Sequence, residues 1–106
     1  MKIQVVQNSI KREEISRIAK EGFGDFIKAV VDLEQGIMAI GGELHADEEA
    51  VLSEQCGSRR EFLWGINLYP EKSDDEWIEF NSMVNIKPQF GNRSRDIIDE
   101  AVKQKI

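Results

Sequence analysis

The hydrophobic positions first predict a helix near the start of the chain. Apolar residues recur at i, i+3, i+4, i+7 and i+8 over residues 15–23, which is the pattern of one helical face. Ser9 and Lys11 are the two candidate caps, and Ile10 with Ile15 would form a hydrophobic staple around Lys11. The glycines of EGFGD end the helix, and the β-forming residues of KIQVV predict a short strand before it.

The segment FIKAVVDLEQGIMAIGGEL predicts a β-hairpin over residues 26–44. Two runs of β-forming residues flank residues 35–36, Gln-Gly, and the glycine supplies the positive φ that a tight turn requires. A two-residue loop sets Val31 opposite Ile40 and makes an opposite-charge pair of Lys28 and Glu43. A three-residue loop loses that pair, so we predict the two-residue register.

Alternating residues predict a second hairpin from residues 62–70 and 77–88, joined by the acidic loop EKSDDE. Pairing Tyr69 with Trp77 aligns apolar side chains on one face. The same register sets Asn67 against Glu79 on the opposite face, which is therefore expected to be polar.

Two further helices are predicted. In ADEEAVLSEQCG, Asp47 is the expected N-cap, Glu48 and Glu49 complement the positive end of the helix dipole, and Gly57 stops the helix. After a turn at residues 91–92, Ser94 is the expected cap of a last helix, whose apolar stripe is Ile97, Ile98, Ala101 and Val102.

The order of these elements predicts an α+β domain. We expect an antiparallel or mixed sheet of about five strands built from two hairpins, with the helices covering one face. At 106 residues and 41% hydrophobic content, residues 1–106 are expected to form a single domain.

Composition and net charge limit the compartment and the kinds of binding partner that we expect for this protein. No apolar run approaches the roughly 20 residues of a membrane-spanning helix, and the N-terminus lacks a secretory apolar region, so we expect a cytoplasmic protein. The net charge of −6 repels nucleic acid and anionic membranes. The basic stretches at residues 59–60 and 93–95 are short, so we expect the protein to bind neither nucleic acid nor a membrane.

The stretch GGELHADEEA holds the single histidine of the chain among four carboxylates. Glu43, His45 and Asp47 could share a divalent metal, which makes a metal-dependent hydrolase the alternative function, although the spacing matches neither HExxH nor a calcium loop. The simpler interpretation is a turn followed by a helix cap. Cys56, the lone cysteine, excludes an internal disulfide and lies roughly 13 Å from His45 along a helix, so we assign no catalytic residue and expect no cofactor.

The segment FGNRSRD is a candidate anion-binding site, because a glycine turn before a helix exposes backbone N–H groups beside two arginines. The polar sheet face could contribute further ligands. The candidate ligand-binding residues are Lys28, Glu43, His45, Asn67, Glu79, Asn81, Asn85, Asn92, Arg93 and Arg95.

Three accounts of the polar sheet face are open. It could bind a small polar ligand, it could be an ordinary solvated face, or it could be buried in a homodimer through Leu63, Tyr69, Trp77 and Met83. Our main expectation is a small binding or accessory protein, rather than an enzyme, that holds an anionic ligand or a protein partner. A structural homo-oligomer without a small ligand is the other alternative.

The segments KAVVDLEQGIMAIGGELHADEEAVL, LWGINLYP and WIEFNSMVNIKPQFGNRSR resemble a family of small uncharacterised prokaryotic proteins, a domain of unknown function. The resemblance covers nearly the whole chain, and GGELHAD and GNRSR are its most specific parts. It implies one complete domain and no particular activity.

Overall fold

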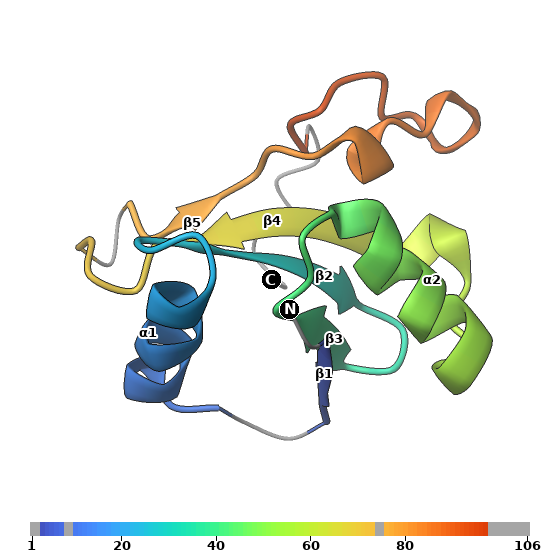
Figure 1. Ribbon diagram of the computed structural model, residues 1–106. Helices are drawn as coiled ribbons and strands as arrows, with labels where there is room; N and C mark the ends of the chain where they lie inside the picture. The colour runs from blue at the N-terminus through green and yellow to red at the C-terminus, as the bar shows by residue number, and fades with distance from the viewer. Residues whose placement is uncertain (1–2, 8–9, 74–75, 98–106) are drawn as a thin grey trace.

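A five-stranded antiparallel sheet forms the centre of the computed structural model, which describes residues 3–7, 10–73 and 76–97 (Figure 1). The strand order is β1-β3-β2-β4-β5, and every pairing is antiparallel. The α+β prediction is confirmed. The strands are β1 (Gln4–Val6), β2 (Ile27–Asp32), β3 (Ile37–Ile40), β4 (Leu63–Leu68) and β5 (Ile78–Glu79), and the α-helices in the described ranges are α1 (Arg12–Glu21) and α2 (His45–Cys56).

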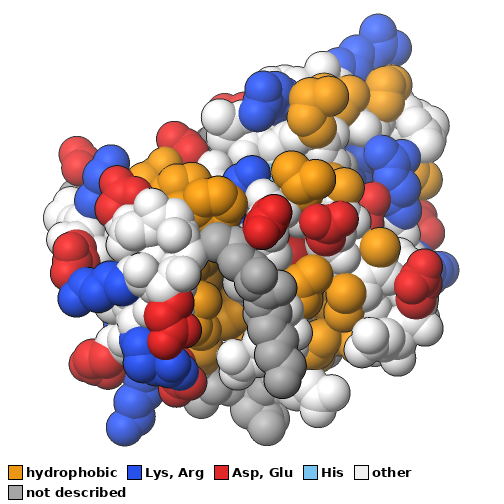
Figure 2. Space-filling view, viewed as in Figure 1, with side chains coloured by type: hydrophobic (Ala, Val, Ile, Leu, Met, Phe, Trp, Pro, Cys, Tyr) orange, Lys and Arg blue, Asp and Glu red, His pale blue; other side chains and the backbone are white. Residues whose placement is uncertain are grey.

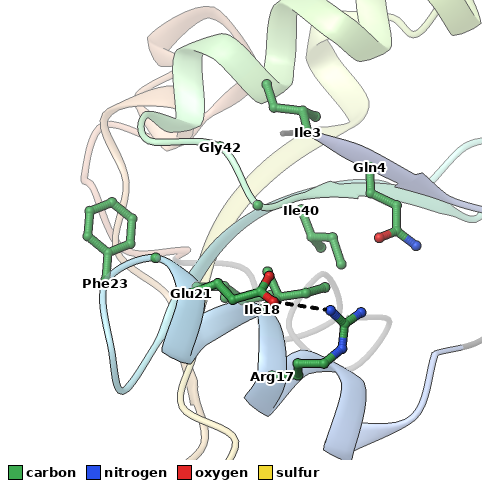
Figure 3. A pocket seen from close by; sticks show the side chains of 11 residues that line it. Ile3, Gln4, Arg17, Ile18, Glu21, Phe23, Ile40 and Gly42 are labelled. Carbon is green, nitrogen blue, oxygen red and sulfur yellow. Dashed lines mark hydrogen bonds and ion pairs between the residues drawn. The ribbon is translucent and has the colours of Figure 1, made fainter. Parts of the chain in front are cut away.

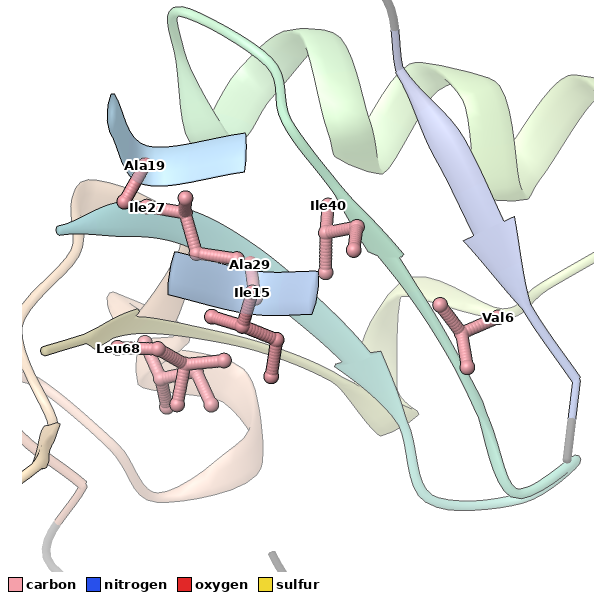
Figure 4. Packing of buried hydrophobic residues seen from close by; sticks show 8 residues of the cluster. Val6, Ile15, Ala19, Ile27, Ala29, Ile40 and Leu68 are labelled. Carbon is pink, nitrogen blue, oxygen red and sulfur yellow. The ribbon is translucent and has the colours of Figure 1, made fainter. Parts of the chain in front are cut away.

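The two helices pack on opposite faces of the sheet. Ala29 of β2 packs in one hydrophobic cluster with Ile15 of α1, whose side chains Figure 4 shows against the sheet. The next residue, Val30, packs in a second cluster with Leu52 of α2. Because successive strand residues point to opposite faces, the prediction that the helices cover one face is wrong. The central strands carry apolar side chains on both faces, so each face requires its own cover.

The first hairpin forms from the two predicted strands, but their register is shifted by two residues. Val31 pairs with Met38 rather than with Ile40, and residues 33–36 form a four-residue turn. On its other edge β2 pairs with β4, where Lys28 lies opposite Asn67. The predicted cross-strand pair of Lys28 and Glu43 does not form, because β3 ends three residues before Glu43.

A buried aspartate explains the longer turn. The side chain of Asp32 accepts hydrogen bonds from the backbone N–H groups of Glu34, at 2.8 Å, and Gln35, at 3.1 Å. The Ser58 hydroxyl donates to the same carboxylate at 2.6 Å. An aspartate side chain that binds the backbone two and three residues ahead favours a wider turn over the two-residue loop.

The second hairpin begins in the predicted register and then ends early. Asn67 pairs with Glu79, and the backbone N–H of Tyr69 donates to the carbonyl of Trp77 at 2.7 Å, as predicted. However, β5 ends at Glu79 instead of continuing to residue 88. The chain then forms two short 3-10 helices, η2 (Met83–Asn85) and η3 (Pro88–Phe90), and η2 packs against β4 and α2.

Gly65 permits this departure from the sheet. A Cβ atom at Gly65 would lie 2.6 Å from Ser82 and 2.8 Å from Val84, so only glycine lets the segment cross so closely. The Asn85 side chain replaces the missing strand residue: its Oδ1 accepts from the Gly65 N–H at 2.7 Å, and its Nδ2 donates to the Gly65 carbonyl at 2.9 Å.

The helix ends differ partly from the predictions. α1 follows Lys11, one of the two candidate caps, and Ser9 lies outside the described residues. α2 begins at His45, so Asp47 lies in its first turn and is not the predicted N-cap. Gly57 ends α2 with a φ of 66°, as predicted.

The predicted last helix lies almost entirely beyond the described residues, although Ile97 is fully buried as expected. In the part of the chain that the structure describes, none of the helices is both long and apolar enough to cross a membrane.

Candidate functional site

His45 lies where α2 meets the sheet, on the face opposite α1. Its Nε2 lies 2.8 Å from the backbone oxygen of Ile66. Because a carbonyl only accepts hydrogen bonds, this contact assigns the proton of the neutral ring to Nε2 and leaves Nδ1 as the acceptor. Burial lowers the pKa of His45 below 6.5, although the Ile66 contact opposes that shift. The imidazole is therefore neutral at pH 7.

Two cations from distant parts of the chain act on this imidazole. Lys28 of β2 and Arg95 of the C-terminal segment both lower the pKa of His45 through their charges. Among the described residues, neither Lys28 nor Arg95 forms an ion pair with a carboxylate. Lys28 instead lies over the ring of Phe23, with Nζ 5.3 Å from the ring centre. The charges of Lys28 and Arg95 thus both act on the same imidazole, and neither cation has an acidic partner among the described residues.

Glu48, which the sequence suggested only as a charged residue at the start of a helix, has a different place in this region. It lies one helical turn after His45 in α2, and its side chain is fully buried. Its Oε2 accepts from the Gly42 N–H at 2.9 Å, while Oε1 has no hydrogen-bond partner in the described structure. Burial raises the pKa of Glu48 to about 9, so the carboxyl is protonated at pH 7. Its predicted role as a charged residue at the helix dipole is wrong.

Gly42 is the feature of the sequence that is related to the burial of Glu48. A Cβ atom at Gly42 would lie 2.9 Å from Cγ of Glu48, so the glycine makes room for the buried carboxyl. One glycine and one acid six residues apart are too common a pair to predict such a contact from sequence alone.

The candidate amides on the sheet face serve the fold. Asn85 closes the edge of β4 as described above. Asn67 donates to Oε1 of Glu79 at 2.8 Å and to the carbonyl of Asn81 at 3.4 Å. Asn92 donates to the backbone oxygens of Asn85, Ser94 and Asp96 at 2.7 to 2.9 Å, which shapes the C-terminal segment. The side-chain NH2 groups of Asn67, Asn85 and Asn92 are therefore already engaged within the chain, whereas Oδ1 of Asn67 is buried without a hydrogen-bond partner in the described structure.

The remaining candidates separate into different environments. Glu43 and Asp47 are exposed, whereas His45 is half-buried against the sheet. Within the described ranges, no three His, Cys, Asp or Glu side chains are placed to share a metal ion. Arg93 and Arg95 are both exposed, but only Arg95 influences His45.

The sheet face itself is not open to solvent. α2 and the segment around Val84 cover it, and Leu63 is fully buried in the cluster that they form. The four residues of the predicted dimer face are consequently not one exposed surface, because only Met83 among them is largely exposed, at 66%.

These observations define a small antiparallel α+β domain whose polar cluster lies at the start of α2. The chain belongs to the family described as "Protein of unknown function (DUF5674)", whose model matches residues 4–106. No curated protein and no solved structure matches the chain.

Proposed function

We propose that this protein is a small binding domain that holds an anionic group between Lys28, His45 and Arg95. The proposal is carried by the charges of Lys28 and Arg95, which both lower the pKa of His45. Charge-assisted hydrogen bonds from such side chains are the usual means of holding a carboxylate or a phosphate.

Lys28 and Arg95 are among the described cations that form no ion pair, as are Lys11, Lys72 and Arg93. The protein carries six more acids than bases, and Arg17, Lys20, Arg59 and Arg60 each form an ion pair with a nearby carboxylate. Lys28 has no such partner among the residues that the structure describes, although it influences both His45 and Glu48. Because Glu48 is protonated at pH 7, it adds no negative charge to compete with an arriving anion. The positive end of the α2 dipole adds to the attraction.

Protonation of His45 would accompany binding. With Nε2 held by Ile66, Nδ1 is an acceptor when the ring is neutral and becomes a donor when the ring is charged. An anion favours the charged form, so its binding raises the pKa of His45 toward or above 6.5. The domain therefore takes up a proton as it binds its ligand.

Inorganic phosphate, titrated at constant ionic strength against chloride, is the probe that tests this function. His45 is the only histidine, so its imidazole resonances report the site without ambiguity. We expect saturable shifts of those resonances and an increase in thermal stability of about 1.4 kcal/mol at a phosphate concentration of ten times Kd. Lys28→Gln combined with Arg95→Gln should abolish both effects.

The matched control is Lys20→Gln combined with Arg59→Gln, which removes the same charge from two cations that have acidic partners. This control should bind phosphate as the unmodified protein does. Equal losses in the two double variants would mean that phosphate responds only to net charge, and that result would contradict the proposed site.

A further inference from the structure

Three aromatic side chains form a row at the end of the sheet that lies beyond the start of α2. The rings of Phe23 and Phe26 stack with centres 4.9 Å apart and planes inclined by 12°, and Phe26 stacks on Tyr69 at 5.2 Å and 25°. We call these three residues the aromatic row. Phe23 is 41% exposed, so the row reaches the molecular surface at its Phe23 end.

The aromatic row lies on the same face of the sheet as the proposed anion site. Ile27 and Leu68 are cross-strand partners in the hydrophobic cluster on the α1 side. Because successive strand residues point to opposite faces, the neighbouring residues Phe26 and Tyr69 point toward the α2 side. Lys28 lies two residues after Phe26 and points to that same face.

Lys28 joins the aromatic row to the proposed anion site. Its Nζ lies 5.3 Å from the ring centre of Phe23, and its charge also acts on His45. Phe23 lines the pocket between α1 and the sheet, but Figure 3 shows its ring pointing away from Ile18 and Ile40. Figure 2 shows hydrophobic side chains at the surface between the C-terminal end of α1 and the start of α2. An anion held by Lys28 would therefore lie next to an exposed aromatic ring.

The charges at the two ends of the aromatic row differ. At the Tyr69 end, Nζ of Lys72 lies 4.4 Å from the ring centre. Burial and then the charges of Glu79 and Asp25 raise the pKa of Tyr69, so two acids oppose that cation. At the opposite end, Lys28 has no acidic partner in the described part of the chain. These charges favour an anionic group at the Lys28 end of the row.

We infer that the ligand is a small aromatic phosphate monoester, with its ring against Phe23 and its phosphate beside Lys28 and His45. This inference rests on the proposed anion site and specifies the class of ligand that the site takes. A phosphate monoester carries nearly two negative charges at pH 7, which matches the two cations of that site, Lys28 and Arg95. A planar ring adds one more stacked member to the aromatic row, whereas a saturated ring cannot stack in this way.

Three phosphate monoesters test the inference when they are titrated at pH 7.5 against the imidazole resonances of His45, namely methyl, cyclohexyl and phenyl phosphate. All three carry nearly the same charge at this pH, so differences in affinity report the organic group. Phenyl phosphate should bind about fivefold more tightly than cyclohexyl phosphate, which is the usual advantage of an aromatic pair beyond its buried area. Methyl phosphate should bind most weakly, because it has no ring.

Phe23→Leu tests the placement of the ring, because leucine keeps an apolar side chain and removes the aromatic face. The ratio of phenyl to cyclohexyl phosphate affinity should fall from about five to about one. Phe90→Leu is the matched control, since Phe90 is an exposed phenylalanine of η3, and this variant should keep the fivefold ratio. Nuclear Overhauser contacts between phenyl phosphate and the Phe23 ring test the same placement in the unmodified protein.

The outcomes distinguish this inference from the proposed function. Equal affinities for the three esters, all abolished by Lys28→Gln, would overturn the placement of the ring and leave the anion site standing. A preference for phenyl phosphate that survives Phe23→Leu would overturn the role of Phe23. If Lys72→Gln weakens phenyl phosphate binding and Lys28→Gln does not, the ligand lies in the opposite direction and the inference is wrong. Failure of inorganic phosphate and of all three esters to shift the His45 resonances would remove the proposed function itself.

Discussion

Replacing Glu48 with glutamine should remove a strong pH dependence from the stability of this protein. The carboxyl is fully buried, and its pKa is raised from 4.5 to about 9 because burial disfavours the charged form. A group whose pKa is higher in the folded state contributes its full stabilisation below pH 4.5. That contribution is lost as the pH rises toward 9.

The magnitude follows from the two pKa values. Each pH unit between them removes about 1.4 kcal/mol, so the contribution of Glu48 falls by about 4 kcal/mol between pH 5 and pH 8. Glutamine keeps the shape of the protonated acid, and its side-chain oxygen can still accept from Gly42. The stability of Glu48→Gln relative to the unmodified protein should therefore rise by up to about 4 kcal/mol over this interval.

Urea denaturation at pH 5 and pH 8 measures this difference, and other titrating groups cancel because they are common to both proteins. Glu54→Gln is the matched control, since Glu54 is exposed on the same helix. Its effect should be nearly the same at both pH values. A Glu48→Gln effect that is equally independent of pH would refute the conclusion that Glu48 is buried in its neutral form.

Three further predictions concern the sheet and the site. Gly65→Ala should lower the free energy of unfolding by about 1–3 kcal/mol, measured by urea denaturation, because its Cβ would overlap Ser82 and Val84. Asn85→Leu should cost about 2–4 kcal/mol in the same assay, since it leaves the N–H and carbonyl of Gly65 without partners, and a near-neutral result would contradict that role. The affinity for sulfate, which stays a dianion over this range, should increase as the pH falls from 7.5 to 5.5 because the anion favours the protonated form of His45, and His45→Gln should remove that increase in calorimetry.

Local patterns were sufficient to predict much of the sheet. Runs of β-forming residues identified the strands that became β2 and β3, period-two alternation identified β4, and the pairing of Asn67 with Glu79 was correct. Gly57 was correctly identified as a helix end. These features depend on residues close together in sequence, whose preferences act before the rest of the fold is in place.

Contacts between distant residues account for the errors. The bond from Ser58 helps to hold Asp32 in the first turn, and no residue near the turn reveals that partner. Likewise, β5 ends early because Asn85 occupies the edge of β4, twenty residues away from its partner Gly65. From the sequence alone, Asn81 and Asn85 look like the polar face of a strand. The bonds between Asn85 and Gly65 show that Asn85 has a different role.

The candidate site arises from these same departures from the local pattern. In the predicted register Lys28 is neutralised by Glu43, and no free cation remains on β2. The wider turn at Asp32 shifts the register by two residues and leaves Lys28 without that partner. The nearby acid, Glu48, is buried against Gly42 in its protonated form and so does not replace Glu43. In the function that we propose, a bound anion would supply the countercharge for Lys28.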